Sequence, residues 1–183
     1  NVYDEDVAFT LTSDQASVTT ANFIRGDGAA TYTVPITVTS VGLENITLSG
    51  TGVVVAAAAT DTAITLNLNK VVLPSTSGTT NEDVAVTGAK LTTVNVNASG
   101  SAVSMDDIDL AAATTINLDA GVKFTTGELV TTGTKATLNI TGSGAVSLGT
   151  LVDGITTVAA GDATGAITMT GPGSNNKSAV ITL

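Results

Sequence analysis

The side chains that could do chemistry in this sequence are mainly carboxylates. Asp106, Asp107 and Asp109 lie within one short segment. Calcium takes about six to eight oxygen ligands from carboxylates, carbonyl groups and water. Asp106, Asp107 and Asp109 are therefore a candidate site for Ca²⁺. The alternative interpretation is an ordinary turn whose acidic side chains face solvent.

Paired carboxylates also cleave glycosidic bonds, and β-helices host polysaccharide-cleaving enzymes. The sequence has no histidine, no cysteine and no tryptophan, and its only arginine is Arg25. Ser-His-Asp and Cys-His arrangements are therefore impossible, and the aromatic and basic groups of a sugar-binding groove are scarce. We expect a protein that is not an enzyme, with a polysaccharide-binding or polysaccharide-cleaving β-helix as an alternative.

The charge balance limits the classes of partner that the protein could bind. Six basic and 16 acidic residues give a formal net charge of −10, which repels nucleic acid and anionic lipid. The longest apolar run, Val53 to Ala59, is far shorter than the roughly 20 residues that a membrane-spanning helix needs. We expect no nucleic-acid partner and no membrane span, and we expect the targeting segment of an exported chain to lie outside these residues.

The elements that must position these side chains are β-strands. Hydrophobic residues make up 43% of the chain and aromatic residues only 3%, so the apolar content is mostly Val, Ala, Leu and Ile. Threonine is also abundant. Because β-branched residues favour strands and charged helix formers are scarce here, the composition predicts an all-β fold.

One six-residue sequence pattern, called the repeated phrase below, recurs four times in the second half of the chain. Its register marks are Val94, Ile116, Leu138 and Val158, so the steps between successive marks are 22, 22 and 20. A second alternating run and a third, shorter apolar pair follow each phrase. The four copies of the phrase occupy residues 91–96, 113–118, 135–140 and 155–160.

Three short strands in about 22 residues predict one coil of a parallel β-helix, or β-solenoid. Stacking then places Asn95, Asn117 and Asn139 one above another as an amide ladder. A β-sandwich is the alternative, because hydrophobic alternation also satisfies two packed sheets. Residues 44–90 alternate in the same way and indicate less regular coils. The stretch from Pro74 to Asn81 interrupts them as a surface loop or insertion.

Residues 1–43 differ from the rest, because they hold four of the five aromatic residues and lack the repeated phrase. We predict an N-terminal antiparallel β cap or subunit-pairing segment in 1–43 and a β-solenoid repeat region in 44–183. Val7, Phe9 and Leu11 form an apolar stripe that we expect to mediate assembly, by packing on a neighbouring subunit or on the 32–38 strand.

The repeated phrase, with its Gly-Ala-Val-Ser-Leu continuation, resembles the Thr/Ala/Gly-rich β-repeats of Gram-negative S-layer proteins and large RTX-type surface adhesins. The resemblance covers residues 91–170 well and 44–90 loosely. It implies secretion, a place at the cell surface in a lattice or appendage, and calcium-dependent assembly. The Gly-Gly-x-Gly-x-Asp calcium repeats of that family do not occur in this sequence.

Residue chemistry and resemblance together favour a structural subunit or domain of an extracellular bacterial surface layer. Its partners are expected to be copies of itself, with cell-surface polysaccharide as a second candidate. The alternative outside the enzyme class is a strand-exchanging extracellular filament or adhesin subunit, in which residues 1–13 pair with another copy.

Overall fold

The structure is a computed structural model, and every regular element that it describes is a β-strand, as the composition predicts. It describes residues 2–3, 9–10, 20–28, 32–35, 40–48, 53–57, 60–73, 84–110, 112–151, 154–172 and 180–182. The strands are β1 (Val2–Tyr3), β2 (Phe9–Thr10), β3 (Thr20–Gly28), β4 (Tyr32–Pro35), β5 (Ser40–Leu48), β6 (Val53–Ala56), β7 (Ala63–Asn69), β8 (Val72–Leu73), β9 (Val84–Thr87), β10 (Thr93–Ala98), β11 (Val103–Asp109), β12 (Thr115–Ala120), β13 (Phe124–Val130), β14 (Ala136–Gly142), β15 (Val146–Leu151), β16 (Ile155–Ala163), β17 (Ile167–Pro172) and β18 (Val180–Thr182).

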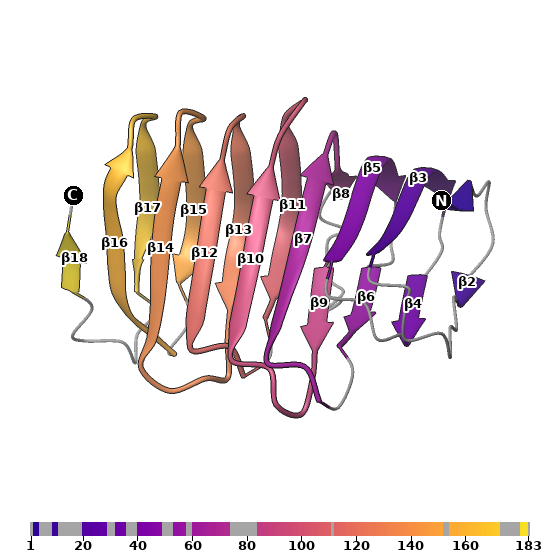
Figure 1. The fold of residues 1–183 in the computed structure, drawn as a ribbon. Helices are drawn as coiled ribbons and strands as arrows, with labels where there is room; N and C mark the ends of the chain where they lie inside the picture. Colours follow the sequence, from indigo (N-terminus) through magenta and orange to yellow (C-terminus); the bar gives the residue numbers. More distant parts are fainter. Residues whose placement is uncertain are drawn as a thin grey trace.

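The chain winds as a parallel β-solenoid. In its regular part each strand pairs in parallel with the strand two elements later, as β10 does with β12 and β11 with β13. This pattern produces two stacks of strands on opposite sides of the coil (Figure 1). The first stack contains β1, β3, β5, β7, β10, β12, β14, β16 and β18, and the second stack contains β2, β4, β6, β8, β9, β11, β13, β15 and β17. The solenoid prediction is confirmed over the β-sandwich alternative.

The predicted repeat length is also confirmed. Val94 stands opposite Ile116, and Ile116 opposite Leu138, so each mark pairs with the mark one repeat later. Leu138 then stands opposite Val158 after a slightly shorter step, and the pairing of β14 with β16 contains two register shifts. The four regular coils are therefore β10–β11, β12–β13, β14–β15 and β16–β17.

The number of strands per coil differs from the sequence prediction, because each regular coil has two strands instead of three. The second and third apolar runs of a coil belong to one bent strand. In β11, Val103, Met105 and Ile108 are buried, while Asp106 and Asp107 both face outward. β13 and β15 break their alternation at the same place. Two successive outward residues turn the strand around a corner without ending it.

One coil is longer than the others. In the pairing of β7 with β10, Thr65 stands opposite Asn95, and 30 residues separate the two along the chain. The extra length lies at the corner, because β8 and β9 both pair with the single strand β11. The predicted loop from Pro74 to Asn81 falls between β8 and β9, outside the described residues.

The antiparallel N-terminal cap is a wrong prediction for the described residues. β1 pairs with β3, β2 with β4, β3 with β5 and β4 with β6, and every one of these pairings is parallel. β5 spans the predicted boundary between residues 43 and 44 and pairs in parallel with β7. The aromatic content that suggested a separate cap therefore occurs on strands that stack like the other coils.

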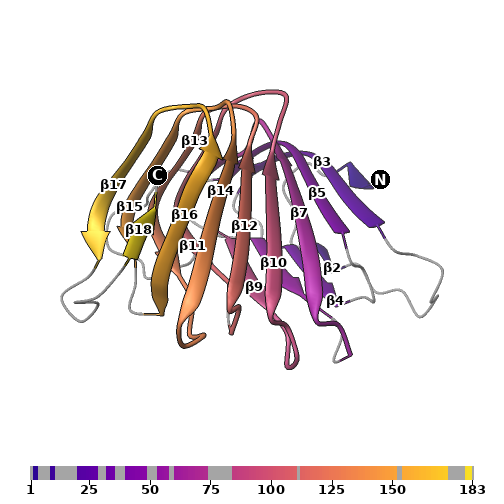
Figure 2. The ribbon, with the colours of Figure 1, turned by 60° about the vertical axis from the view of Figure 1, so that its left-hand side comes forward.

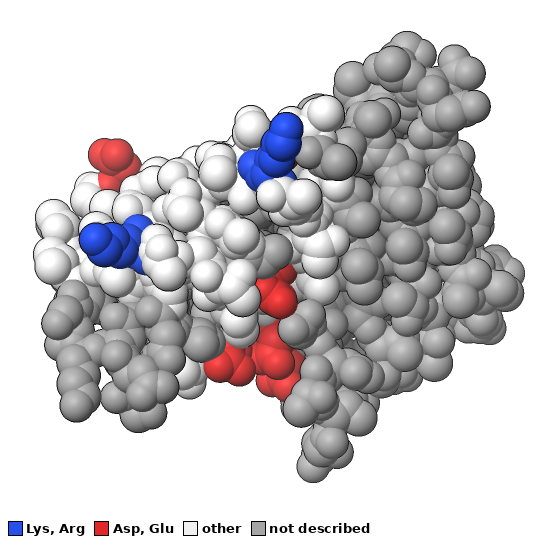
Figure 3. Space-filling view, turned by 90° about the horizontal axis from the view of Figure 1, so that it is seen from below, with Lys and Arg blue, Asp and Glu red and all other residues white. Residues whose placement is uncertain are grey.

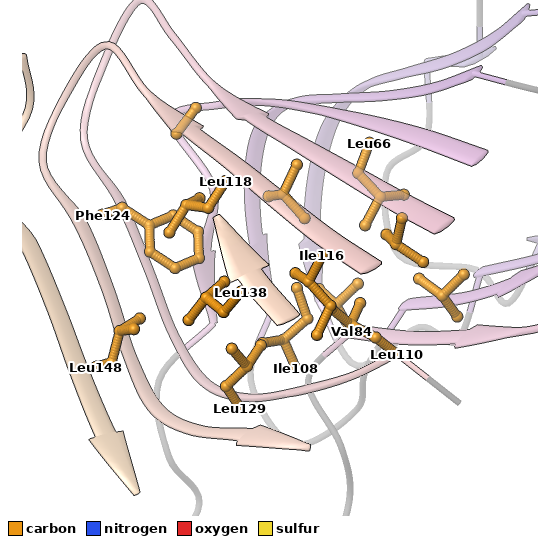
Figure 4. Close-up of a cluster of buried hydrophobic side chains, with 14 of the residues drawn as sticks. Leu66, Val84, Ile108, Leu110, Ile116, Leu118, Phe124, Leu129, Leu138 and Leu148 are labelled. Carbon is orange, nitrogen blue, oxygen red and sulfur yellow. The ribbon is translucent and has the colours of Figure 1, made fainter. Parts of the chain in front are cut away.

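The core is the space between the two stacks. The register marks Val94, Ile116, Leu138 and Val158 are each at most 1% exposed, as predicted. The labelled side chains of the two stacks point toward one another there, and Phe124 is the largest of the fully buried ones (Figure 4). Burying a side chain of this size contributes about 1.5–3 kcal/mol, and no single coil could achieve it alone. Hydrophobic burial therefore depends on stacking.

Close stacking also explains several glycines. A Cβ atom on Gly149 would overlap the carbonyl oxygen of Gly127 in the preceding coil, and one on Gly144 would overlap that of Val122. Only glycine lets the two backbones approach this closely. Gly127 and Gly149 lie at the corner of the bent strands, where Asp106 occupies the equivalent place in β11.

Candidate functional site

The most regular outer surface of the described solenoid is the first stack from β7 to β16. These strands lie side by side (Figure 2), and their outward positions form columns because the register is constant from β7 to β14. We call this surface the Thr/Asn face. Its three columns are Ala63, Thr93, Thr115, Thr137 and Thr157; Thr65, Asn95, Asn117, Asn139 and Ala159; and Asn67, Asn97, Asp119, Thr141 and Asp162.

The predicted asparagine ladder is present in the middle column. Asn117 Nδ2 donates to Asn95 Oδ1 at 2.8 Å, and Asn139 Nδ2 donates to Asn117 Oδ1 at 2.7 Å. The ladder begins at Thr65, whose Oγ1 accepts from Asn95 Nδ2 at 3.3 Å. It stops at β16, where Ala159 stands opposite Asn139. The asparagines are half-buried on the outside of the coil, so they fix the outer surface and not the core.

A second amide pair extends the pattern into the third column. Asn97 Nδ2 donates to Asn67 Oδ1 at 2.9 Å across the long coil. The register of β7 with β10 is therefore supported by two side-chain hydrogen bonds, although the chain between these strands is longer than in the regular coils. The Thr/Asn face continues unbroken past the corner where the coil length changes.

The threonine column was not singled out by the sequence analysis. Thr93, Thr115, Thr137 and Thr157 stand in register and are half-buried. The first three precede the ladder asparagines by two positions, so the signal was in the same repeat that identified the asparagines. Together the two columns make an uncharged strip of hydroxyl, methyl and amide groups.

Within β7 to β16 of the first stack, the charge of the outward columns is confined to one edge of the Thr/Asn face. On the described Thr/Asn face the only ionisable side chains are Asp119 and Asp162, both in the third column and both exposed. The second stack carries Asp106, Asp107 and Asp109 on β11 and Glu128 on β13. Figure 3, which views the solenoid from below, shows acidic side chains gathered in one place, with basic side chains apart from them on the same side. The two faces therefore differ sharply in electrostatic character.

The predicted calcium residues lie on one bent strand. Asp106, Asp107 and Asp109 are all half-buried, and Asp107 stands opposite Glu128 of the next coil. Adjacent like charges on paired strands repel. Within the described part of the chain, no group of three or more acidic side chains converges as a metal ligand set. A calcium ion at this corner would take its remaining ligands from carbonyl groups, water or a second molecule.

A buried hydroxyl group supports the same corner from inside. Thr126 is 2% exposed, and its Oγ1 lies 3.1 Å from the Asp106 carbonyl oxygen and 2.8 Å from that of Glu128. Its neighbours in the inward column are Met105 and Leu148. A polar residue in this apolar column gives the corner carbonyl groups a hydrogen-bond donor. The sequence pattern did not reveal this role, because Thr is common at outward positions too.

The predicted assembly residues are only partly described. Val7 and Leu11 lie outside the described residues. Phe9 belongs to β2 and stands opposite Tyr32 of β4, so this residue of the predicted stripe lies beside the described part of the predicted 32–38 strand, one of the two positions expected for the stripe. Its role in assembly stays a prediction.

None of the described elements is a helix long and apolar enough to cross a membrane. Comparisons of the chain with protein-family models, with curated proteins and with solved structures found no match.

Proposed function

We propose that this chain is a structural part of a bacterial surface layer, secreted to the cell surface and assembled there from copies of itself. The observation that carries the proposal is the Thr/Asn face, where the same few side-chain types recur in register from coil to coil. A repeating face of this kind suits repeated contacts between molecules, whereas a catalytic site needs a few different groups converging on one point.

The construction of the scaffold supports a mechanical role. Each regular coil is held to the next by two parallel strand pairings, a shared apolar core and, in the first stack, side-chain amide bonds. In such a solenoid every coil contacts only its neighbours, so stiffness extends along the axis from coil to coil. A rigid unit transmits lattice contacts better than a flexible one does.

Ca²⁺ is the cation that we propose for assembly. Neighbouring copies with a net charge of −10 each repel one another, and two unit charges about 4 Å apart cost about 1 kcal/mol in water. The acidic corner at Asp106, Asp107 and Asp109 contributes carboxylate oxygens, but the described residues supply no complete ligand set. A cation shared with carboxylates of a second copy would complete the set and convert the repulsion into attraction.

Negative-stain electron microscopy of the purified chain tests this function. With Ca²⁺ present and the protein concentration rising, we expect ordered sheets, and far-ultraviolet circular dichroism of the same samples should show a persistent β signal. Long single fibres would instead support the strand-exchanging filament or adhesin subunit. Dispersed particles at every concentration, with or without Ca²⁺, would contradict both assemblies.

A further inference from the structure

We infer that the Thr/Asn face is where a second copy of this chain docks, with the two faces mating across their threonine and asparagine columns. This inference rests on the proposed function and adds to it the surface that makes the contact. The partner is a molecule with the same face, because the first two columns, those of threonine and of the asparagine ladder, have neither the charge to attract an oppositely charged partner nor the apolar character that holds a small ligand.

Charge is the first argument for this occupant. Each copy carries 16 acidic against six basic residues, so without a bridging cation two copies repel one another least where both surfaces are uncharged. The threonine and asparagine columns of the described first stack hold no ionisable side chain, whereas the second stack presents Asp106, Asp107, Asp109 and Glu128 at its corner. Contact through these two columns of the Thr/Asn face therefore carries a smaller electrostatic cost than contact through the acidic corner.

The hydrogen-bonding capacity of the ladder is the second argument. A side-chain amide has two N–H donors and an oxygen with two lone pairs. Asn117 uses one donor toward Asn95 and accepts one bond from Asn139, which leaves one donor and one acceptor directed away from the ladder bonds. A facing ladder in a second copy can satisfy both, and water would satisfy them equally well in the free molecule.

Side-chain shape is the third argument. Identical residues stacked at about 4.8 Å form straight ridges separated by grooves, and two such surfaces interdigitate as they do between paired sheets of stacked parallel strands. The side chains of Thr93, Thr115, Thr137 and Thr157, which stand in register, form one ridge of this kind. Mating would bury these methyl groups together with the aliphatic parts of the asparagines.

The size of the face limits the strength of one contact. Five strands about 4.8 Å apart and three outward positions about 6.6 Å apart cover roughly 24 by 20 Å. Two mated faces then bury roughly 900 Å² in total, below the roughly 1,200–2,000 Å² of a stable complex. A single pair of copies should therefore dissociate when dilute, and assembly should become strong only where several contacts act together.

A matched pair of charge substitutions tests the inference. Thr115→Glu places a carboxylate in the threonine column of the Thr/Asn face. Thr125→Glu makes the same change at an outward, half-buried position of the second stack. Light scattering across a protein concentration series, with circular dichroism on the same samples, gives the concentration at half-maximal assembly. If circular dichroism shows that Thr115→Glu has lost its β structure, Thr137→Glu is used in its place, because Thr137 is the next position in the same column.

We expect Thr115→Glu to raise the half-assembly concentration about tenfold or more, because two added charges face each other across the contact. The half-assembly concentration of Thr125→Glu should lie within about threefold of that of the unchanged chain. This substitution only adds one negative charge per copy to the general repulsion between copies. Raising the NaCl concentration should partly restore Thr115→Glu, because mobile ions screen the added repulsion. Equal loss in both variants, or no loss in Thr115→Glu, would overturn the inference while leaving the proposed function intact.

Two other outcomes are distinguishable from these. An unchanged chain that never assembles contradicts the proposed function and the inference together. An unchanged chain that stays monomeric but sediments with insoluble cell-wall polysaccharide, with the binding lost in Thr115→Glu, would show that the face binds a glycan and that a second copy is the wrong occupant.

Discussion

Asn117 donates its side-chain N–H to the side-chain oxygen of Asn95 at 2.8 Å, although 22 residues of chain separate them. The bond joins equivalent positions of successive coils, and Asn139 continues it in the same direction at 2.7 Å. The hydrogen bonds of an amide ladder form only in the register in which each asparagine stands opposite another, so the ladder stabilises that register alone. It therefore helps to select one stacking of the coils from the alternatives that hydrophobic alternation alone would permit.

Each substitution in the asparagine ladder should lower the free energy of unfolding in proportion to the number of ladder bonds that it removes. Asn117→Ala removes two side-chain bonds and leaves Asn95 Oδ1 and Asn139 Nδ2 without their ladder partners, so we expect a loss of about 1–2 kcal/mol. Asn139→Ala removes only one such bond, because Ala159 follows it, and should cost about half as much. Urea denaturation followed by circular dichroism compares them. Equal losses for the two variants would show that the ladder bonds do not determine the effect.

The corner glycines should not accept a methyl group. In Gly149→Ala the new Cβ would overlap the Gly127 carbonyl oxygen, and the coils would have to separate, which we expect to cost at least about 2 kcal/mol. Gly161→Ala is the matched control, because among the described residues no heavy atom beyond its chain neighbours lies within 4 Å of the new Cβ. It should change stability by no more than about 0.5 kcal/mol. Thermal unfolding measures both variants. Equal melting temperatures for Gly149→Ala and Gly161→Ala would show that the close approach of the backbones at the corner does not exclude a methyl group.

The buried hydroxyl group of Thr126 should contribute to stability mainly through its hydrogen bonding and less through the volume that it fills. Thr126→Val keeps the shape but removes the donor beside the carbonyl oxygens of Asp106 and Glu128. We expect a loss of about 1–2 kcal/mol, because the corner carbonyl groups lose a hydrogen-bond donor. Thr126→Ser keeps the hydroxyl and loses one methyl group, which should cost about 1 kcal/mol. If Thr126→Val were as stable as the unchanged chain in urea, the corner carbonyl groups would not need this donor.

Assembly should depend on divalent cations more than folding does. Chelation with EDTA at fixed ionic strength removes any bridging Ca²⁺ between copies that each carry a net charge of −10, and monovalent salt can only weaken their repulsion. Particle size measured by light scattering should fall while the circular dichroism signal of the strands persists. Restoring Ca²⁺ should restore particle size, and Mg²⁺ at the same concentration is the control for charge alone. Assemblies that survive thorough chelation would show that cations are dispensable.

The N-terminal stripe should contribute to assembly independently of the acidic corner. Deleting residues 1–13 removes Val7, Phe9 and Leu11, an apolar group that we expect to lie at a contact with another subunit or with the 32–38 strand. The truncated chain should assemble poorly or lose stability in its first coils. A truncated chain that assembles and melts as the full chain does would assign the contact elsewhere.

The regular coils could be predicted because their repeat has nearly constant length. Val94, Ile116 and Leu138 recur at one step, so the sequence alone specifies which of these residues stack on one another. The N-terminal strands could not be assigned in this way. Their partners are separated by irregular steps, and the step from Phe23 to Leu43 is shorter than the step from Ser40 to Thr65. Without a fixed period, their aromatic content suggested a different structure.

The sequence by itself determined the strand composition, the inward and outward alternation, the coil length and the alignment of Asn95 with Asn117 and Asn139. These are local or periodic properties, and each follows from the residues within one or two coils. Only the tertiary structure decided that a coil has two strands, because the corner at Asp106 and Asp107 ends no hydrogen-bonded strand. It also decided that the uncharged threonine and asparagine columns of the Thr/Asn face lie apart from the acidic corner. That separation arises when coils stack in register, since stacking gathers residues one repeat apart into one column and gives the solenoid faces of different chemistry.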